Sequence, residues 1–111
     1  PPKDSIYDEV EPSFLYGKPD EYLKEKIRIP QNAIILGISG IVNIEFIVEA
    51  NGEVKYVKII APQNRQLGYG IEEACMQAVL STSKMWEPAE KDGIKVRSRV
   101  RAPIEIDNFS F

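Results

Sequence analysis

The sequence contains no histidine and only one cysteine, and these absences exclude several classes of function. Without histidine the chain cannot build a Ser-His-Asp triad, a Cys-His nucleophile or an imidazole-based zinc site. Cys75 alone cannot form a disulfide within the chain, and on an apolar helix stripe it is expected to be a small core residue. No apolar run approaches the roughly 18 residues that a membrane-spanning helix needs. We therefore expect no enzymatic activity and no cofactor.

The chain has 111 residues, of which 43% are hydrophobic, and its net charge is only -3. These values predict one globular domain with a modest core. The small acidic surplus gives no general attraction for nucleic acid, so we expect no nucleic-acid partner. Because the chain begins with Pro1-Pro2 rather than methionine, we expect a trimmed or processed chain, from which a signal peptide or a membrane anchor could have been removed.

The N-terminal part lacks periodicity, and residues 1–18 are expected to form an extended lead-in to a domain of residues 19–111. Pro19 suits the first turn of a helix, which should continue to about Arg28. After a short turn that Gly37 ends, the central part of the chain predicts a β-hairpin. Its two strands, residues 41–48 and 53–60, are rich in β-branched residues and flank an Asn-Gly turn.

The C-terminal half predicts a helix followed by a long strand. Apolar residues recur at helical spacing from Ile71, which indicates an amphipathic helix ending near Ser81. Residues 94–106 alternate instead, and this is typical of a half-buried strand. One face of that strand carries Val96, Ser98, Val100, Ala102, Ile104 and Ile106, and the other carries Lys95, Arg97, Arg99 and Arg101.

This order of elements predicts an α+β fold. The helix between the second and third strands acts as a crossover, so the third strand should lie antiparallel beside the first. We therefore expect a three-stranded antiparallel sheet in the order 2-1-3, with two helices packed on one face. The third strand is then an edge, and its arginines and Pro103 would guard it against unwanted pairing. The same edge could accept an extended peptide as an added strand.

Other side chains have simpler interpretations. Trp86 could serve as a ligand platform, but a tryptophan directly after a helix more commonly closes a core. None of the acidic residues falls on an expected apolar face, so a buried pair of catalytic carboxylates is not predicted.

Taken together and in order, short motifs from Pro19 to Ile106 resemble the C-terminal domain of TonB energy transducers, especially the TonB-like domains common in Bacteroidetes. The corresponding residues are Ile29-Pro30, with Ile29 in place of the usual tyrosine, Ala33, Gly37, Gly40, Asn51-Gly52-Glu53-Val54, Glu73-Ala74, Ala78-Val79, Trp86-Glu87-Pro88-Ala89, Gly93 and Pro103-Ile104.

The resemblance implies a periplasmic interaction module that supports energy-dependent uptake. Such a domain binds a short peptide, the TonB box of an outer-membrane transporter, by strand addition to its final strand. An N-terminal segment absent from this chain would link it to an inner-membrane anchor and to motor proteins. Carried onto this sequence, the peptide-binding residues are Arg97, Ser98, Arg99, Val100 and Arg101. The alternative is a structural appendage of an envelope or sensor protein, without a transport role, that forms a homodimer through its strand edges.

Overall fold

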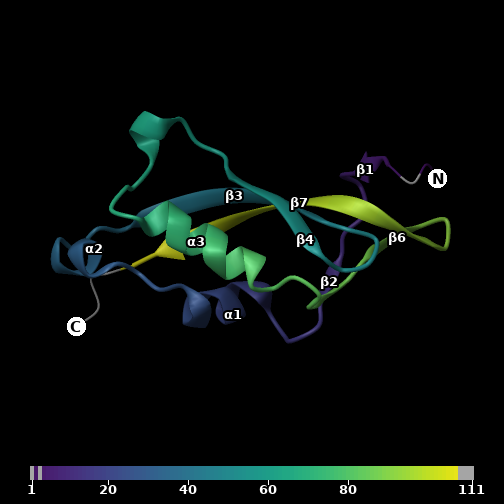
Figure 1. Ribbon diagram of the computed structural model, residues 1–111, viewed down its shortest axis with the longest axis horizontal. Coiled ribbons are helices and arrows are strands. Elements are labelled where there is room, and N and C mark those ends of the chain that lie inside the picture. The colour runs from purple at the N-terminus through teal and green to yellow at the C-terminus, as the bar shows by residue number, and fades with distance from the viewer. Residues whose placement is uncertain (1, 3, 108–111) are drawn as a thin grey trace.

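The computed structural model describes residue 2 and residues 4–107, which form an elongated body (Figure 1). Residues 108–111, the end of the expected domain, lie outside the described residues, as do residues 1 and 3 of the lead-in. The elements are β1 (Ile6–Tyr7), β2 (Ser13–Phe14), α1 (Pro19–Lys26), α2 (Gln31–Ile35), β3 (Gly40–Val48), β4 (Val54–Ile59), a 3-10 turn (Gln63–Arg65), α3 (Ile71–Leu80), β5 (Trp86–Glu87), β6 (Ala89–Lys91) and β7 (Ile94–Ile106). Within the described part of the chain, no helix is long and apolar enough to cross a membrane.

The predicted α+β class and the order of the three long strands are confirmed. Strand β3 lies between β4 and β7 and runs antiparallel to both. The β3–β7 ladder is the longest contact in the molecule, and it runs from Gly40 opposite Ile106 to Val48 opposite Ser98. The expected hairpin between β3 and β4 is also confirmed, although only Gly52 of its Asn-Gly pair adopts a positive φ, of 89°.

The prediction of a three-stranded, purely antiparallel sheet is wrong. Among the described residues the sheet has five strands, because β6 forms a hairpin with β7 and β1 pairs with β7 in the parallel direction. Strands β2 and β5 form a separate two-stranded sheet, and the short turn expected before Gly37 is a third α-helix, α2. These strands have only two or three residues each, too few for an alternating pattern to be visible in the sequence.

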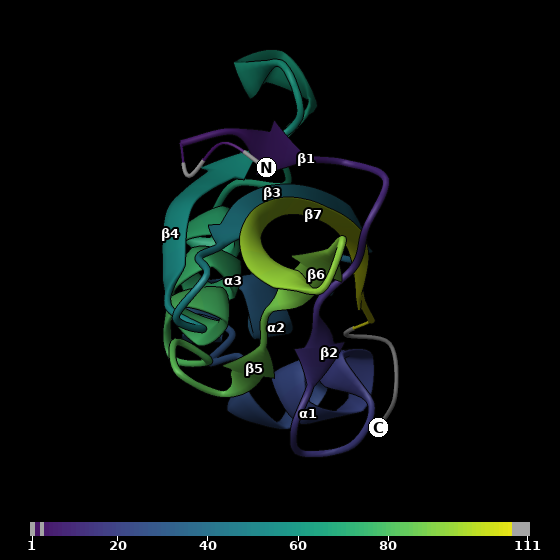
Figure 2. The same cartoon turned by 90° about the vertical axis from the view of Figure 1, so that its right-hand side faces the viewer.

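Helices α1 and α3 lie on the same side of the sheet, as expected (Figure 2). Helix α1 begins with Pro19 and has two acidic residues in its first turn, where the helix dipole favours negative charge. The core between these helices and the sheet is built from Leu23, Ala33, Val42, Ile44, Phe46, Val48, Val54, Ile71, Cys75, Ala78, Val79, Trp86, Ile104 and Ile106. The helix-facing residues of β7 belong to this core or pack against it: Ile104 and Ile106 are buried, and Val100 and Ala102 are partly buried.

Candidate functional site: the open edge of β7

Strand β7 offers its outer side as a row of backbone groups. The Asn43 carbonyl accepts the N–H of Ile60 at 2.8 Å, so the backbone groups of Asn43 point toward β4. Its partner across the β3–β7 ladder, Pro103, therefore directs its carbonyl to the other side of β7. Every second residue of a strand directs its backbone groups to the same side. Arg99, Arg101 and Glu105 therefore direct both N–H and C=O away from β3. Within the described part of the chain, no strand pairs with this stretch.

The expectation that β7 forms an edge along its whole length is wrong at one place. Ile6 lies opposite Arg97 and Tyr7 opposite Ser98, so β1 covers two of the five residues that were expected to bind a peptide. The other three, Arg99, Val100 and Arg101, belong to the stretch that no described strand covers. The open edge, defined here as residues 99–105, thus starts where the N-terminal segment leaves the sheet.

Charged side chains hold β1 in this position. The guanidinium of Arg97 donates to the backbone carbonyl of Asp4 at 3.0 Å. A neighbouring pair joins Nζ of Lys91 to the Glu9 carboxylate at 3.2 Å, and this bond lowers the pKa of Glu9 and raises that of Lys91. The pair of Lys91 and Glu9 is exposed, and exposed ion pairs stabilise a structure only weakly. The contacts of these charged side chains therefore add little to the two-residue ladder between β1 and β7.

The arginines of β7 are engaged on the outer face of the sheet. Arg97 makes a two-pronged contact with Glu49 at 2.5 and 3.2 Å, and this hydrogen bond raises the pKa of Arg97. Arg101 donates to Glu45 at 2.8 Å. The role expected of these arginines as an edge-guarding charged face is thus combined with specific pairing inside the chain.

Glu45 is a buried acidic residue, although it does not lie on the expected apolar face of its strand. Only 7% of this residue is exposed, beneath the cations of Lys58, Arg99 and Arg101 at 3.2, 3.8 and 2.8 Å. Burial by itself would raise the pKa of Glu45, but hydrogen bonds from Arg101 and Lys58 outweigh burial and hold the pKa below its ordinary value. Alternation in the sequence does not predict this burial, because Glu45 lies on the polar face of its strand.

A second buried acid, Glu72, explains the shape of the loop before α3. Its carboxylate accepts the backbone N–H of Leu67 at 2.7 Å and of Gly68 at 2.9 Å. Burial and the nearby charge of Glu72 raise the pKa of Cys75 to about 11. The thiol is therefore protonated at neutral pH and unsuited to act as a nucleophile, in agreement with its expected place in the core.

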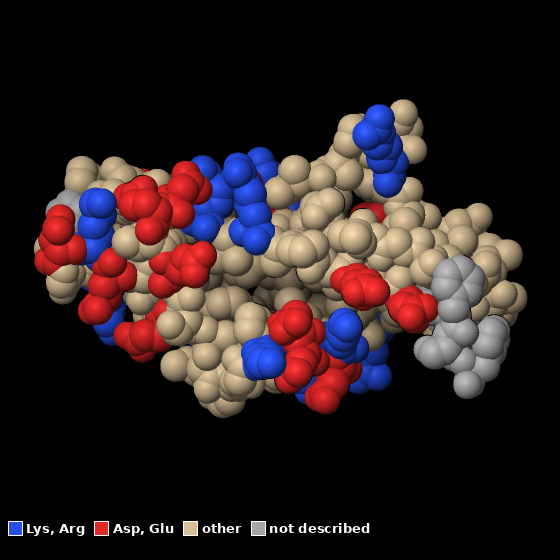
Figure 3. Space-filling view, turned by 180° about the vertical axis from the view of Figure 1, so that it is seen from behind, with Lys and Arg blue, Asp and Glu red and all other residues tan. Residues whose placement is uncertain are grey.

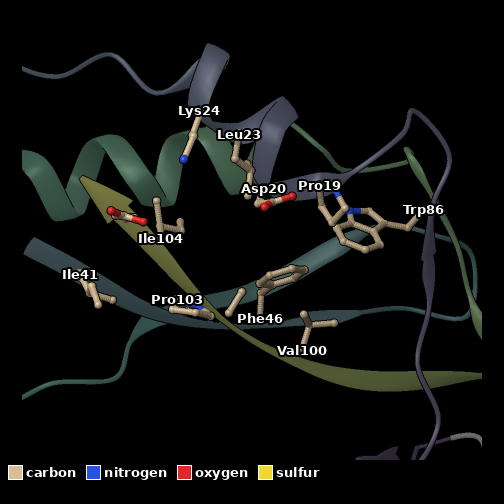
Figure 4. A pocket seen from close by; sticks show the side chains of 12 residues that line it. Pro19, Asp20, Leu23, Lys24, Ile41, Phe46, Trp86, Val100, Pro103 and Ile104 are labelled. Atoms are coloured by element: carbon tan, nitrogen blue, oxygen red, sulfur yellow. The ribbon is translucent and has the colours of Figure 1, made fainter. Parts of the chain in front are cut away.

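An apolar cavity of about 410 Å³ lies between helix α1 and the open edge (Figure 4). Its apolar walls come from four elements: Leu23 of α1, Phe46 of β3, Trp86 of β5 and Val100, Ala102 and Ile104 of β7. The charged residues Asp20, Lys24 and Glu105 also line it. The sequence did not predict this cavity, because its walls are dispersed along the chain. Viewed from behind Figure 1, acidic and basic residues gather at one end, basic residues lie beside them along the upper border, and a mixed group lies along the lower border (Figure 3).

Trp86 is fixed in place at the back of this cavity. Its Nε1 donates to the hydroxyl of Thr82 at 3.0 Å. Its ring packs against Phe14 and Phe46, with centroids 5.1 and 5.7 Å away. The expectation that Trp86 closes the core is confirmed, and the same ring also lines the cavity.

Comparisons with known proteins agree with this architecture. The solution structure of the Helicobacter pylori TonB C-terminal domain, residues 194–285, matches with a TM-score of 0.61 and 23% identity, over 83% of this chain and 91% of that one. A longer form of that domain, residues 179–285, matches with a TM-score of 0.63 and 22% identity, over 84% and 79% of the two chains. No curated protein matches in sequence.

The family model of the Gram-negative bacterial TonB protein C-terminal domain matches residues 25–106, which include helix α3 and the complete β3, β4 and β7 strands. The match spans most of the chain and ends at the last residue of β7. The resemblance seen in the ordered sequence motifs is therefore confirmed, and the chain belongs to the TonB C-terminal domain family, a family of interaction modules.

Proposed function

We propose that this domain works in the periplasm and binds an extended peptide of an outer-membrane transporter, which adds as a strand to β7. Such a contact would support energy-dependent uptake, with an inner-membrane anchor and motor proteins joined through a segment N-terminal to this chain. Family membership supports the class of partner. The observation that carries the proposal is the row of outward-facing backbone groups on β7 beside an apolar cavity.

The proposed contact residues are Arg97, Ser98, Arg99, Val100 and Arg101. A peptide that pairs with residues 99–105 can dock beside β1 without removing it. A peptide that also pairs with Arg97 and Ser98 must first displace β1, because one side of a strand accepts only one neighbour. In both cases the N–H and C=O groups of Arg99 and Arg101 form the centre of the contact.

The experiment uses ¹⁵N-labelled domain and a synthetic transporter peptide. We expect amide shift changes concentrated at residues 99–105 and abolished by Arg101→Pro, which removes an outward N–H from the edge. The matched control is Arg101→Ala, which also loses the ion pair with Glu45 but keeps that N–H, and it should retain binding within a few fold.

Two results would contradict the proposal. The first is a failure to bind at the edge, seen either as amide shift changes confined to another surface or as no binding at millimolar peptide. The second is a stable homodimer in sedimentation that excludes the peptide, since it would favour pairing between strand edges of two copies instead.

A further inference from the structure

We propose that the apolar cavity beside the open edge is a specificity pocket, which receives one large apolar side chain of the docked peptide. The inference rests on the proposed strand addition and goes beyond it, because it states which peptides the edge selects. A bare strand edge offers only main-chain groups and accepts many sequences, whereas a pocket beside the edge discriminates among side chains.

The position of the pocket follows from the alternation of strands. Val100, Ala102 and Ile104 are successive helix-facing residues of β7, and all three line the cavity. A strand added to the open edge lies about 4.8 Å from β7, and every second side chain on it points to the same face. These side chains enter the space between β7 and helix α1, which is where the cavity lies (Figure 4).

The chemistry of the pocket favours a large apolar group. Leu23, Phe46 and Trp86 form its inner walls, and each is less than a tenth exposed. Trp86 is held in place by packing against Phe14 and Phe46 and by its bond to Thr82. A volume of about 410 Å³ leaves room for leucine, methionine or phenylalanine.

The opposite face of the docked strand meets a different environment. Its side chains would lie beside Arg99 and Arg101, and the side chain of Arg101 is 65% exposed despite its bond to Glu45. Acidic groups are favoured next to such a guanidinium. The asymmetry defines the ligand class: an extended peptide with a large apolar residue toward α1 and acidic neighbours toward the arginines.

The test uses three acetylated peptides of sequence Thr-Val-Glu-X-Glu-Val-Thr, with leucine, phenylalanine or alanine at X. In an extended strand, X and both valines share one face and both glutamates share the other. We expect the leucine and phenylalanine peptides to bind about tenfold or more tightly than the alanine peptide, because they bury more apolar area. Fluorescence anisotropy or NMR titration measures the difference.

Filling the pocket from within should abolish this preference. Ala102→Leu places a larger side chain in the cavity while leaving the backbone groups of the edge in place. The variant should bind all three peptides with the affinity that the natural domain has for the alanine peptide. The matched control, Ala50→Leu at an exposed position of the β3–β4 turn, should keep the full preference.

The outcomes separate the two proposals. If all three peptides bind equally to the natural domain with shift changes at residues 99–105, strand addition stands and the specificity pocket is overturned. If Ala102→Leu keeps its folded spectrum and still prefers leucine over alanine, the pocket is again overturned. If the transporter peptide binds at the edge but none of the three designed peptides binds at millimolar concentration, the inferred ligand class is overturned. If neither the transporter peptide nor the designed peptides bind, strand addition is overturned as well.

Discussion

The carboxylate of Asp8 accepts two contacts from Nη1 of Arg99, at 3.1 and 3.0 Å, and so ties the N-terminal segment to the first residue of the open edge. A peptide that pairs with Arg97 and Ser98 as well as with the open edge must displace this segment, because β1 occupies that part of β7. Asp8→Asn weakens the tie, and we expect peptide affinity to rise about two- to fivefold, since an exposed ion pair contributes roughly 0.2–1 kcal/mol.

Isothermal titration of the transporter peptide at low salt measures this gain. The matched control is Glu11→Gln, which removes the same charge from an exposed position of the same segment. An equal gain in both variants would mean that net charge, and not the contact with Arg99, controls the affinity. An unchanged affinity in Asp8→Asn would show that β1 and the peptide do not interfere.

Gly52 should tolerate no side chain. Its φ is 89°, its N–H donates to the Glu49 carbonyl and its own carbonyl accepts the N–H of Lys84, so the turn cannot shift easily. A Cβ built at Gly52 would lie 2.7 Å from the carbonyl oxygen of Trp86, a backbone atom. Backbone strain and this overlap together predict that Gly52→Ala lowers the free energy of unfolding by about 2–4 kcal/mol.

Gly93 provides the matched control for this prediction. Its φ is 77°, similar to that of Gly52, but a Cβ there meets no atom within 4 Å. Gly93→Ala should therefore show only the strain of the left-handed backbone, about 1–2 kcal/mol. Urea denaturation of both variants checks the order, and equal losses would remove the steric part of the argument.

The elements that the sequence predicted correctly are those long enough to show a period. The alternation of residues 94–106 and the apolar stripe from Ile71 each extend over several repeats, and helix α3 and strand β7 begin where expected. The order of the three long strands followed from connectivity alone. A parallel partner such as β1, with two paired residues and exposed acidic neighbours, has no comparable pattern.

The candidate site was only partly predictable for a related reason. The arginine face of β7 was predicted from the alternation of residues 94–106, because alternation is a pattern of neighbouring residues in the sequence. The cavity depends on Leu23, Phe46, Trp86 and Ile104, which only the tertiary fold brings together. The buried state of Glu45 likewise depends on cations from two other strands, which the pattern of its own strand cannot show.

The ion pairs around Glu45 should make stability depend on pH in a defined direction. The pKa of Glu45 is lower in the folded chain than its ordinary value of 4.5, because Arg101 and Lys58 stabilise the carboxylate. The stabilisation is therefore fully present above the unfolded pKa and is lost as pH falls through the folded pKa. Glu45→Gln should be less stable than the natural domain at pH 7, and the difference should shrink as pH falls below about 4.5.

Urea denaturation at pH 7 and at several values below 4.5 measures this difference. Glu90→Gln, an exposed residue of strand β6, is the control and should change stability little at any pH. A difference between Glu45→Gln and the natural domain that stays constant with pH would assign the effect to packing rather than to ionisation.

Two buried hydroxyl groups should respond in opposite ways to removal. Ser98 is fully buried, and its hydroxyl has no hydrogen-bond partner among the described residues, whereas the hydroxyl of Thr82 donates to Val79 and accepts from Trp86. Ser98→Ala should therefore raise the free energy of unfolding by up to about 1 kcal/mol, because an unsatisfied polar group is removed. Thr82→Val keeps the shape but leaves the Trp86 N–H unpaired, and it should lower that free energy by about 1–3 kcal/mol. Thermal and urea unfolding of both variants measure these changes in the free energy of unfolding. A loss of stability in Ser98→Ala would mean that the hydroxyl of Ser98 has a hydrogen-bond partner in solution.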